Sequence, residues 1–429
     1  MRIVELNENT KSELLDKLIQ RSPANYTDYE KTVSDIVENV RQNGDKAIFE
    51  YTKEFDHCDI DKENVRVTRK EIEEAYNSLD PEFIRVLKEC TENIRVFHEK
   101  QKRTTWIDTK DDGTILGQRI IPIEKSGVYV PGGKAAYPSS VLMNVVPAKV
   151  AGVSNIVMLT PPGKDGKVNA GTLAAADIAG VDEVYKIGGA QAIAAMAFGT
   201  ESIPKVDKIT GPGNIFVALA KKACFGYVGI DSIAGPSEIL VLADETANPR
   251  FVAADLLSQA EHDEMASAIL ITTSRELAKK VSDEIDVFLK TLERAEIIKK
   301  SLDNYGYIFV ADNMNDAIDA ANAVASEHME IVTKNPYEVM TKVKNAGAIF
   351  LGEYSSEPLG DYYAGPNHIL PTNRTARFFS PLSVDDFVKK TSIISYSRDA
   401  LKKASADIEL FAKKEGLTAH ANSIHVRFE

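Results

Sequence analysis

The sequence has 429 residues, of which 44% are hydrophobic and 27% are charged, a composition typical of a globular protein with about three domains. This composition excludes an intrinsically disordered chain, a collagen-like repeat and a small scaffold held together by disulfides. The net charge of -13 argues against general binding to nucleic acid or to an anionic membrane surface.

The N-terminal quarter of the chain is predicted to be helical. Residues 10–20 form a short amphipathic run, and turn residues follow at 21–27. Two longer stretches, 28–55 and 68–102, carry apolar residues at helical spacing with charges between them. A strand-like segment then covers 114–130 and ends in the turn Pro131-Gly132-Gly133.

From residue 155 onward, strand patterns alternate with helical patterns in two successive blocks. The predicted strands cover 155–160, 183–187, 205–210, 238–242, 268–272, 307–310, 330–333 and 348–351. The predicted helices between them include 190–198, 215–224, 249–263, 275–292 and 315–326. This alternation is typical of parallel βαβ units, so we expect an α/β protein with two open sheets of similar topology.

The C-terminal part is polar and is predicted to be helical from Ser383 onward. The spacing of Ser383 and Asp386 fits a capping box at the start of a helix. The chain ends in a small segment, 416–429. We expect this tail to dock either on the body of its own chain or on a partner.

A first group of candidate ligands lies near the end of the helix predicted at 249–263. Gln259 and His262 are three residues apart and share a helix face, with Asp255 nearby. An amide oxygen, an imidazole and a carboxylate could bind zinc or a similar ion. Taken alone, however, this spacing favours the polar end of a solvated helix, because it is much less specific than a zinc-binding HExxH motif.

A second group, Ser326-Glu327-His328, lies where a predicted helix gives way to a strand. Such a junction at the edge of an α/β sheet is a place where substrate crevices form. The adjacent glutamate and histidine could supply two proton-transfer groups of different pKa. Equally, His328 could simply compensate the dipole at the end of the helix, and the spacing leaves both readings open.

A third group lies in the glycine-rich loop 360–368. Asp361 and His368 bring a carboxylate and an imidazole to this loop, and one of them could ligate a metal. The alternative is a surface turn with ordinary aspartate and asparagine chemistry.

Two glycine turns follow predicted strands, where phosphate-binding loops occur. Gly211-Pro-Gly-Asn214 precedes a predicted helix, but Phe216 stands where the dinucleotide fingerprint requires its third glycine. The turn at Gly188-Gly-Ala-Gln191 also lacks the full pattern. Binding of a dinucleotide therefore cannot be argued from these turns alone.

The three cysteines are poor candidates for a nucleophile. Cys58 lies among carboxylates that raise the pKa of a thiol, whereas Cys90 and Cys224 lie in predicted helices. Their odd number and wide separation favour a reducing compartment. Since we find neither a signal peptide nor a membrane span in the sequence, we expect a soluble cytoplasmic protein.

Eight short segments, in order along nearly the whole chain, together resemble the histidinol dehydrogenase family. The block Ala234-Gly-Pro-Ser-Glu238, combined with a later Gln-Ala-Glu-His262, is highly specific. The segments are Gly127-Val-Tyr-Val-Pro-Gly-Gly133, Ile187-Gly-Gly-Ala-Gln191, Gly211-Pro-Gly-Asn214, Asp231-Ser-Ile-Ala-Gly-Pro-Ser-Glu238, Ser258-Gln-Ala-Glu-His262, Ser326-Glu-His328, Asn367-His-Ile-Leu-Pro-Thr372 and Gly416-Leu-Thr-Ala-His420.

The resemblance implies two incomplete Rossmann-like open-sheet domains, with small helical segments at both termini. The expected N-terminal segment is 1–25. A first α/β domain combines 26–110 with 239–382 and carries the metal and catalytic residues, and a second covers 111–238 and binds NAD. The tail, 383–429, is expected to be exchanged with a partner subunit in a homodimer.

The resemblance also implies a reaction, the oxidation of L-histidinol to L-histidine through bound L-histidinal. Two NAD+ molecules and one Zn²⁺ per subunit take part. His328 would act as the base in both hydride-transfer steps, and Glu327 would activate water to attack the aldehyde. A zinc hydrolase with the same ligands, or a binding protein without turnover, are the competing interpretations.

The site residues implied by the resemblance fall into three sets, and none includes His368 or His425. The metal ligands would be Gln259, His262, Asp361 and, from the partner chain, His420. The substrate would contact these four together with Ser237, Glu327, His328 and Glu415. The NAD contacts would be Tyr129, Gln191 and Asn214.

Overall fold

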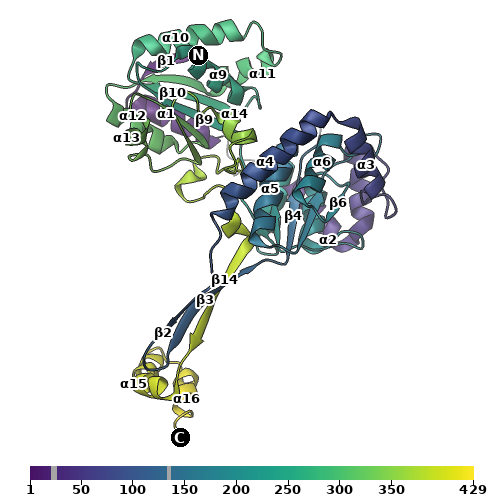
Figure 1. The fold of residues 1–429 in the computed structure, drawn as a ribbon, viewed down its shortest axis with the longest axis vertical. Helices are drawn as coiled ribbons and strands as arrows, with labels where there is room; N and C mark the ends of the chain where they lie inside the picture. The colour runs from purple at the N-terminus through teal and green to yellow at the C-terminus, as the bar shows by residue number, and fades with distance from the viewer. Residues whose placement is uncertain (21–26, 133–136) are drawn as a thin grey trace. The chain divides into compact units, whose positions relative to one another are not determined.

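The computed structural model describes residues 1–20, 27–132 and 137–429, which divide into two compact units. The larger unit comprises 1–101 and 123–387, and the smaller comprises 102–122 and 388–429. Two parallel sheets belong to the larger unit and one antiparallel sheet to the smaller (Figure 1). The domain boundaries expected from the sequence remain a prediction.

The first parallel sheet of the larger unit has five strands. In spatial order they are β6 (Glu183–Tyr185), β5 (Asn155–Leu159), β4 (Lys125–Tyr129), β7 (Lys208–Thr210) and β8 (Gly229–Ile230). All neighbours pair in parallel. Along the chain this is the order third, second, first, fourth, fifth, which is typical of a doubly wound sheet.

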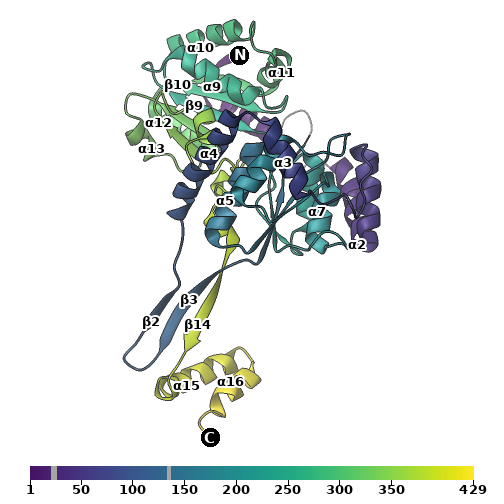
Figure 2. The same ribbon diagram turned by 45° about the vertical axis from the view of Figure 1, so that its right-hand side comes forward.

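Helices cover both faces of this sheet. Consecutive residues of β5 belong to different cores, since Ile156 and Met158 pack in one cluster and Val157 and Leu159 in the other. One face carries α3 (Arg69–Ser78), α4 (Pro81–Glu99), α5 (Pro138–Ala151) and α6 (Ala170–Ala179). The other carries α2 (Thr27–Phe55), α7 (Gly189–Phe198) and α8 (Ile215–Cys224) (Figure 2).

The second parallel sheet has six strands and repeats the topology of the first. Its spatial order is β1 (Arg2–Glu5), β11 (Gly306–Val310), β10 (Ser267–Thr272), β9 (Glu238–Ala243), β12 (His328–Val332) and β13 (Ala348–Leu351). Without β1, the order along the chain is again third, second, first, fourth, fifth. The expected pair of Rossmann-like sheets with similar topology is therefore confirmed.

Helices also cover both faces of the six-stranded sheet. One face carries α9 (Pro249–Ala260), α10 (Arg275–Phe288) and α11 (Ala295–Tyr305). The other carries α1 (Glu8–Gln20), α12 (Met314–Val324) and α13 (Pro336–Met340). Every residue of β9, β10, β11 and β12 is buried, as expected for strands covered on both sides.

The helical prediction for the N-terminal quarter was incomplete in two places. Residues 2–5 form β1, a strand at the edge of the six-stranded sheet that pairs with β11. The single run predicted at 68–102 is broken into α3 and α4. Asp80 caps α4 by accepting a hydrogen bond from the Glu82 backbone, and Pro81 occupies the first turn, where its missing N–H costs nothing.

The strand predicted at 114–130 is two strands that belong to different sheets. β3 (Ile115–Pro122) lies in the smaller unit, where it pairs with β2 (Trp106–Thr109) and with β14 (Val388–Ser395). The next strand, β4, lies in the five-stranded sheet. The division follows Pro122, whose backbone cannot donate a hydrogen bond to a strand ladder.

The prediction of helix from Ser383 onward was wrong for its first part. Residues 384–387 form one 3-10 turn, and residues 388–395 form β14. Asp386 Oδ2 does accept a hydrogen bond from the Ser383 backbone at 2.8 Å, but the helical turn that follows ends at Phe387. Helices resume with α15 (Arg398–Lys414) and α16 (Thr418–His425).

Most of the two turns predicted early in the chain cannot be compared with the structure. Residues 21–26 of the first turn and Gly133 of the second lie outside the described residues. Within the described ranges, none of the helices combines the length and the apolar character needed to cross a membrane.

Candidate active site

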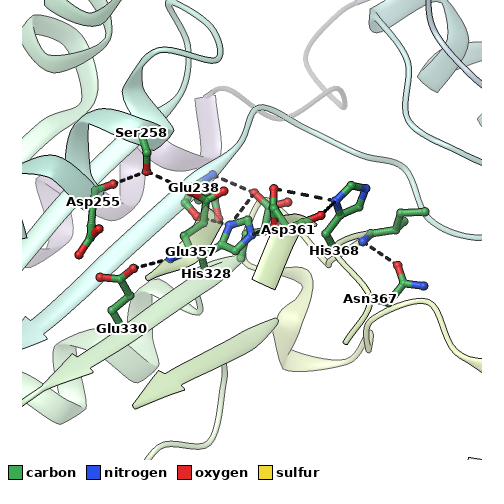
Figure 3. A network of polar contacts seen from close by, with 11 residues as sticks. Glu238, Asp255, Ser258, His328, Glu330, Glu357, Asp361, Asn367 and His368 are labelled. Atoms are coloured by element: carbon green, nitrogen blue, oxygen red, sulfur yellow. Dashed lines mark hydrogen bonds and ion pairs between the residues drawn. The ribbon is translucent and has the colours of Figure 1, made fainter. Parts of the chain in front are cut away.

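Glu327 and His328 are buried where α12 gives way to β12. The neighbouring strand β9 begins at Glu238, and its backbone holds both side chains. The Glu238 N–H donates a hydrogen bond to Glu327 Oε2 at 2.9 Å, and His328 Nδ1 lies 3.2 Å from the Glu238 carbonyl oxygen (Figure 3). The backbone of Glu238 therefore fixes the side chains of both Glu327 and His328.

These contacts also assign roles to the two nitrogens of His328. A carbonyl oxygen can only accept, so Nδ1 must carry the proton that it donates to Glu238. Nε2 is then the atom that can gain or lose a proton. It lies 3.3 Å from Asp361 Oδ1.

Asp361 comes from α14 (Glu357–Tyr362), a short helix that also supplies Glu357. His328, Glu357 and Asp361 each offer a ligand atom, and these atoms all lie within 4.8 Å of one another. Glu357 Oε2 accepts a hydrogen bond from Ser258 Oγ at 3.0 Å, which links α14 to α9. His368 is also close, with Nδ1 3.1 Å from the Asp361 carbonyl oxygen.

The electrostatics of the cluster are dominated by burial and by the pairing of His328 with carboxylates. Burial raises the pKa of Glu327 to about 8. Burial alone lowers the pKa of His328, but the carboxylates of Glu327 and Asp361 outweigh it and raise the value to about 10. Burial likewise raises the pKa of Asp361, but its hydrogen bond with His328 prevails and holds it at about 2.

More carboxyl groups are buried behind this cluster. Glu330, on β12, hydrogen-bonds the Asp255 side chain and accepts a hydrogen bond from the Glu357 backbone at 2.9 Å. Burial raises the pKa of Asp255 to about 6 and that of Glu357 to about 7. So many acids in a poorly solvated place must retain protons or bind a cation.

The predicted ligands Gln259 and His262 lie at the end of α9, which contacts α14. Gln259 is buried, and its Oε1 has no hydrogen-bond partner among the described residues. His262 is exposed, yet partial desolvation lowers the pKa of its imidazole, and the charge of Asp361 opposes that shift. By residue type, an amide oxygen, an imidazole and a carboxylate suit a zinc ion, but the group found among the described residues with ligand atoms within 4.8 Å of one another contains only Asp361 of the three.

The remaining predicted substrate contacts lie elsewhere in the chain. Ser237 directly precedes β9, next to the residue that holds Glu327 and His328. Glu415 follows α15 and His420 lies on α16, so both belong to the smaller unit. Their participation in the site remains a prediction.

The three predicted NAD contacts, Tyr129, Gln191 and Asn214, line one cavity of about 1090 Å³. This cavity lies at the carboxyl ends of the five-stranded sheet. The Tyr129 hydroxyl accepts a hydrogen bond from the Gly189 N–H at 3.0 Å, and both polar atoms of the Gln191 side chain are buried without a partner in the described residues. Asn214 Oδ1 caps α8, which leaves only its Nδ2 to donate to a ligand.

A buried ion pair holds the loop that carries Asn214. Lys221 contacts Asp231, and both side chains are almost completely buried. Lys221 Nζ donates to the Gly211 carbonyl at 3.0 Å, and the Gly211 N–H donates to Asp231 Oδ2 at 2.8 Å. Gly211 has a φ of +121°, and a side chain there would collide with the Tyr129 carbonyl oxygen.

Comparisons with known proteins identify the family. The model of the histidinol dehydrogenase family matches residues 19–428. The chain belongs to the histidinol dehydrogenase family. A histidinol dehydrogenase of Clostridium acetobutylicum is 55% identical over 429 residues, covering 100% of this chain and 99% of the relative. That of Halalkalibacterium halodurans is 56% identical over 430 residues, covering 100% and 99%.

A solved structure agrees with these sequence relatives. The crystal structure of histidinol dehydrogenase from Elizabethkingia anophelis superimposes with a TM-score of 0.94 at 38% sequence identity. The match covers 100% of this chain and 98% of that chain. The α/β fold class with two parallel sheets, predicted from the sequence, is thereby confirmed.

Two residues of the cluster were missed as site residues in the sequence. Glu357 lies four positions before Asp361 on a helix, and this spacing could have revealed it, since it places both carboxylates on one face. His368 was noted in the loop at 360–368 but received no role. It is buried against Asp361 and lines, with His328 and Asp361, a second cavity of about 310 Å³.

Proposed function

We propose that the chain oxidises L-histidinol to L-histidine through L-histidinal, using two NAD+, as the last step of histidine biosynthesis. Membership of the histidinol dehydrogenase family makes it an NAD-dependent oxidoreductase of histidinol. The observation that carries the detailed proposal is that the Glu238 backbone fixes a buried imidazole and a buried carboxyl, His328 and Glu327. His328 also offers a ligand atom within 4.8 Å of those of Glu357 and Asp361.

We propose that one zinc ion per subunit is held by Gln259, His262 and Asp361, with His420 of the partner subunit as fourth ligand. The free Oε1 of Gln259 and the crowded acids behind Asp361 both favour a bound cation. When bound, zinc supplies a positive centre that binds nitrogen donors of histidinol and orients the substrate. Ser237 and Glu415 would also contact the substrate.

Tyr129, Gln191 and Asn214 would hold NAD+ in the larger cavity. Gln191 offers a donor and an acceptor that have no partner among the residues that the structure describes, and Asn214 offers a donor. When bound, NAD+ accepts a hydride in each of the two steps. Gly189 lines this cavity with a φ of +64°, and its lack of a side chain would let the backbone approach the cofactor closely.

In this proposal His328 and Glu327 divide the proton transfers between them. Nε2 of His328 would remove the hydroxyl proton of histidinol, and later that of the hydrated aldehyde, when the Asp361 carboxylate is held by zinc and no longer keeps a proton on Nε2. Glu327 takes a proton from the water that attacks the aldehyde. Its pKa of about 8 makes its carboxylate a stronger base than an exposed glutamate.

The cysteines are unsuited to a covalent alternative. All three are free and buried, and burial raises the pKa of the Cys224 thiol to about 12. A thiolate nucleophile is therefore not available near neutral pH. Free cysteines are also typical of a reducing compartment, so we propose that the enzyme works in the cytoplasm.

We further propose that the protein is a homodimer whose subunits share their active sites. The smaller unit exposes large apolar side chains, among them Ile394 with 73% of its surface exposed and Phe411 with 68%. Apolar surface of this kind is typical of an interaction face. Docking it on a second copy would bring His420 to the partner's ligands. We propose no nucleic acid or membrane partner.

The direct test is a stoichiometric assay of the zinc-loaded protein with L-histidinol and NAD+. We expect two NADH for each histidine formed, with NADH followed by absorbance and histidine by chromatography. Formation of NADH without histidine would place the end of the reaction at the aldehyde. Turnover without NADH would instead support the zinc hydrolase and overturn the proposal.

The shared site is tested by mixing two inactive variants, His328→Asn and His420→Asn, by co-expression. In a mixed dimer, one site combines an intact His328 from one subunit with an intact His420 from the other. Random pairing then restores about one quarter of the wild-type activity. If each subunit used its own His420, every dimer in the mixture would remain inactive.

A further inference from the structure

Asp56 is a charged residue of the larger cavity that none of the roles above uses. It directly follows α2, and its side chain lines the same cavity as Tyr129, Gln191 and Asn214. Phe55, immediately before it, lines the cavity as well. The question is what ligand group this carboxylate faces.

One oxygen of the Asp56 carboxylate lacks a hydrogen-bond donor in the part of the chain that the structure describes. This oxygen, Oδ2, is buried. Burial raises the pKa of Asp56 to about 6, and only the nearby charge of His57 opposes this. At neutral pH the group is therefore ionised but poorly solvated, a state that donors from a bound ligand would stabilise.

Asp56 differs in this respect from two other charged residues of the cavity wall, Asp165 and Lys167. Asp165 Oδ1 already accepts a hydrogen bond from the Lys167 backbone at 3.2 Å. Lys167 Nζ pairs with Glu74 at 3.4 Å. Asp56 also lies close enough to Tyr129 for its charge to raise the pKa of that phenol.

The composition of the wall indicates which part of a dinucleotide lies there. All lining residues fall between Thr32 and Phe216, so in the described chain none comes from β12 or α14, which carry His328 and Asp361. The nicotinamide must reach those residues to exchange a hydride with the substrate. The portion left in the cavity is the adenosine end.

We propose that Asp56 accepts hydrogen bonds from the hydroxyls of the adenosine ribose and thereby selects NAD+ over NADP+. This inference rests on the proposed use of NAD+. A vicinal diol supplies two donors to the two carboxylate oxygens. A 2′-phosphate would remove one donor and place two negative charges against an ionised carboxylate in a poorly solvated position.

The test measures binding by calorimetry, in the absence of histidinol, so that it does not depend on turnover. The ligands are NAD+, NADP+ and NAD+ that lacks the 2′-hydroxyl of the adenosine ribose. The variants are Asp56→Asn, which keeps the shape of the side chain, and Asp165→Asn as a control on the same wall. Melting temperatures confirm that each variant is folded.

For the wild type we expect NADP+ and the deoxy ligand each to bind about tenfold or more weakly than NAD+. In Asp56→Asn the preference over NADP+ falls about tenfold, and loss of the 2′-hydroxyl changes affinity by less than about twofold. Asp165→Asn retains both preferences.

The proposal is overturned if Asp56→Asn, while folded, keeps the wild-type preferences, or if the wild type binds all three ligands equally. An equal effect of the deoxy ligand on wild type and Asp56→Asn would also overturn it, because Asp56 would then lie beside another part of the cofactor. Failure of the proposed function has a different signature, the absence of NADH formation from histidinol by the wild type.

Discussion

The two parallel sheets have the same strand order, yet their candidate sites lie at opposite strand ends. In the five-stranded sheet, the cofactor cavity lies beyond the carboxyl ends, where Tyr129 ends β4 and Asn214 follows β7. In the six-stranded sheet, the polar cluster lies at the amino ends, where Glu238 begins β9 and His328 begins β12. In the six-stranded sheet the site falls between the first and fourth strands, β9 and β12, where the strand order reverses. The cavity of the five-stranded sheet reaches from the ends of the corresponding strands, at Tyr129 and Asn214, over the ends of β5 and β6.

The difference matches the charge that each end of a βαβ unit presents. The carboxyl ends of the strands lead into helix N-termini, such as those of α7 and α8, whose dipoles favour the phosphates of a dinucleotide. The amino ends follow helix C-termini, such as those of α9 and α12, where the partial charge is negative and favours cations. A bound metal ion belongs at that end.

The proposed proton transfers take place at the six-stranded sheet, and His328→Asn is the change expected to slow them most. Asparagine can still donate to the Glu238 carbonyl but offers no basic nitrogen. We expect the turnover of both histidinol and histidinal to fall about 10²- to 10⁴-fold. Single-turnover measurements with each substrate provide the readout, and zinc content should not change. Near-normal rates would exclude His328 as the base.

Glu327→Gln separates the two oxidation steps. Glutamine keeps the acceptor for the Glu238 N–H but cannot remove a proton from water, so the fold of the site should persist. We expect oxidation of histidinal to slow about 10²-fold, while NADH formation from histidinol in the first turnover changes little. An equal loss in the two steps would mean that Glu327 acts on both, and not through water.

The strand alternation of the sequence was sufficient to predict both parallel sheets, because strands buried on both faces leave a strong apolar signal. The signal fails where strands are exposed. β14 has no buried residue, and its polar sequence was interpreted as helix. Pairing across more than 250 positions, as between β14 and β3, leaves no local trace.

The candidate site shows the same division between local and distant information. Glu327 and His328 are adjacent in the sequence, so their pairing could be predicted. Their position could not, because ligand crevices of α/β sheets usually lie at the carboxyl ends of the strands and His328 lies at the amino end of β12. The anchoring of both by the backbone of Glu238 depends on the register of two strands 90 positions apart. Both contacts are made by the backbone of residue 238, so the type of its side chain does not predict them.

The cofactor cavity of the five-stranded sheet is tested at Lys221, whose ammonium group holds the loop that carries Asn214. Lys221→Met leaves Asp231 and the Gly211 carbonyl without their partner, so the loop that carries Asn214 should shift. We expect the KM for NAD+ to rise about tenfold, with kcat at saturating NAD+ within about twofold of wild type.

Two further variants check the origin of this effect. Lys221→Arg should recover part of the affinity, since it restores a cation. Lys222→Met is the matched control, because Lys222 is exposed and pairs only with Glu30 on α2 among the described residues. A fall in kcat with an unchanged KM would indicate that the ion pair serves the chemistry and not the cofactor loop.

The smallest effect concerns stability and also belongs to the cofactor cavity. The pKa of Asp56 is raised from its ordinary 3.8 to about 6, so the folded state binds this proton more tightly than the unfolded state. The protonated carboxyl therefore contributes stability below pH 3.8, and this contribution is lost as the pH rises to about 6. Above pH 6, Asp56→Asn should melt on the order of 1 °C higher than wild type, and the gap should close near pH 4.

With NAD+ bound, the wild type should instead melt at a higher temperature than Asp56→Asn. The ribose hydroxyls stabilise ionised Asp56 in the wild type but have only a neutral amide in the variant, so saturating NAD+ raises the melting temperature of the wild type further. Thermal scans from pH 4 to 8, with and without NAD+, measure both effects. A variant that is stabilised equally at every pH would show that its gain comes from packing and not from the buried charge.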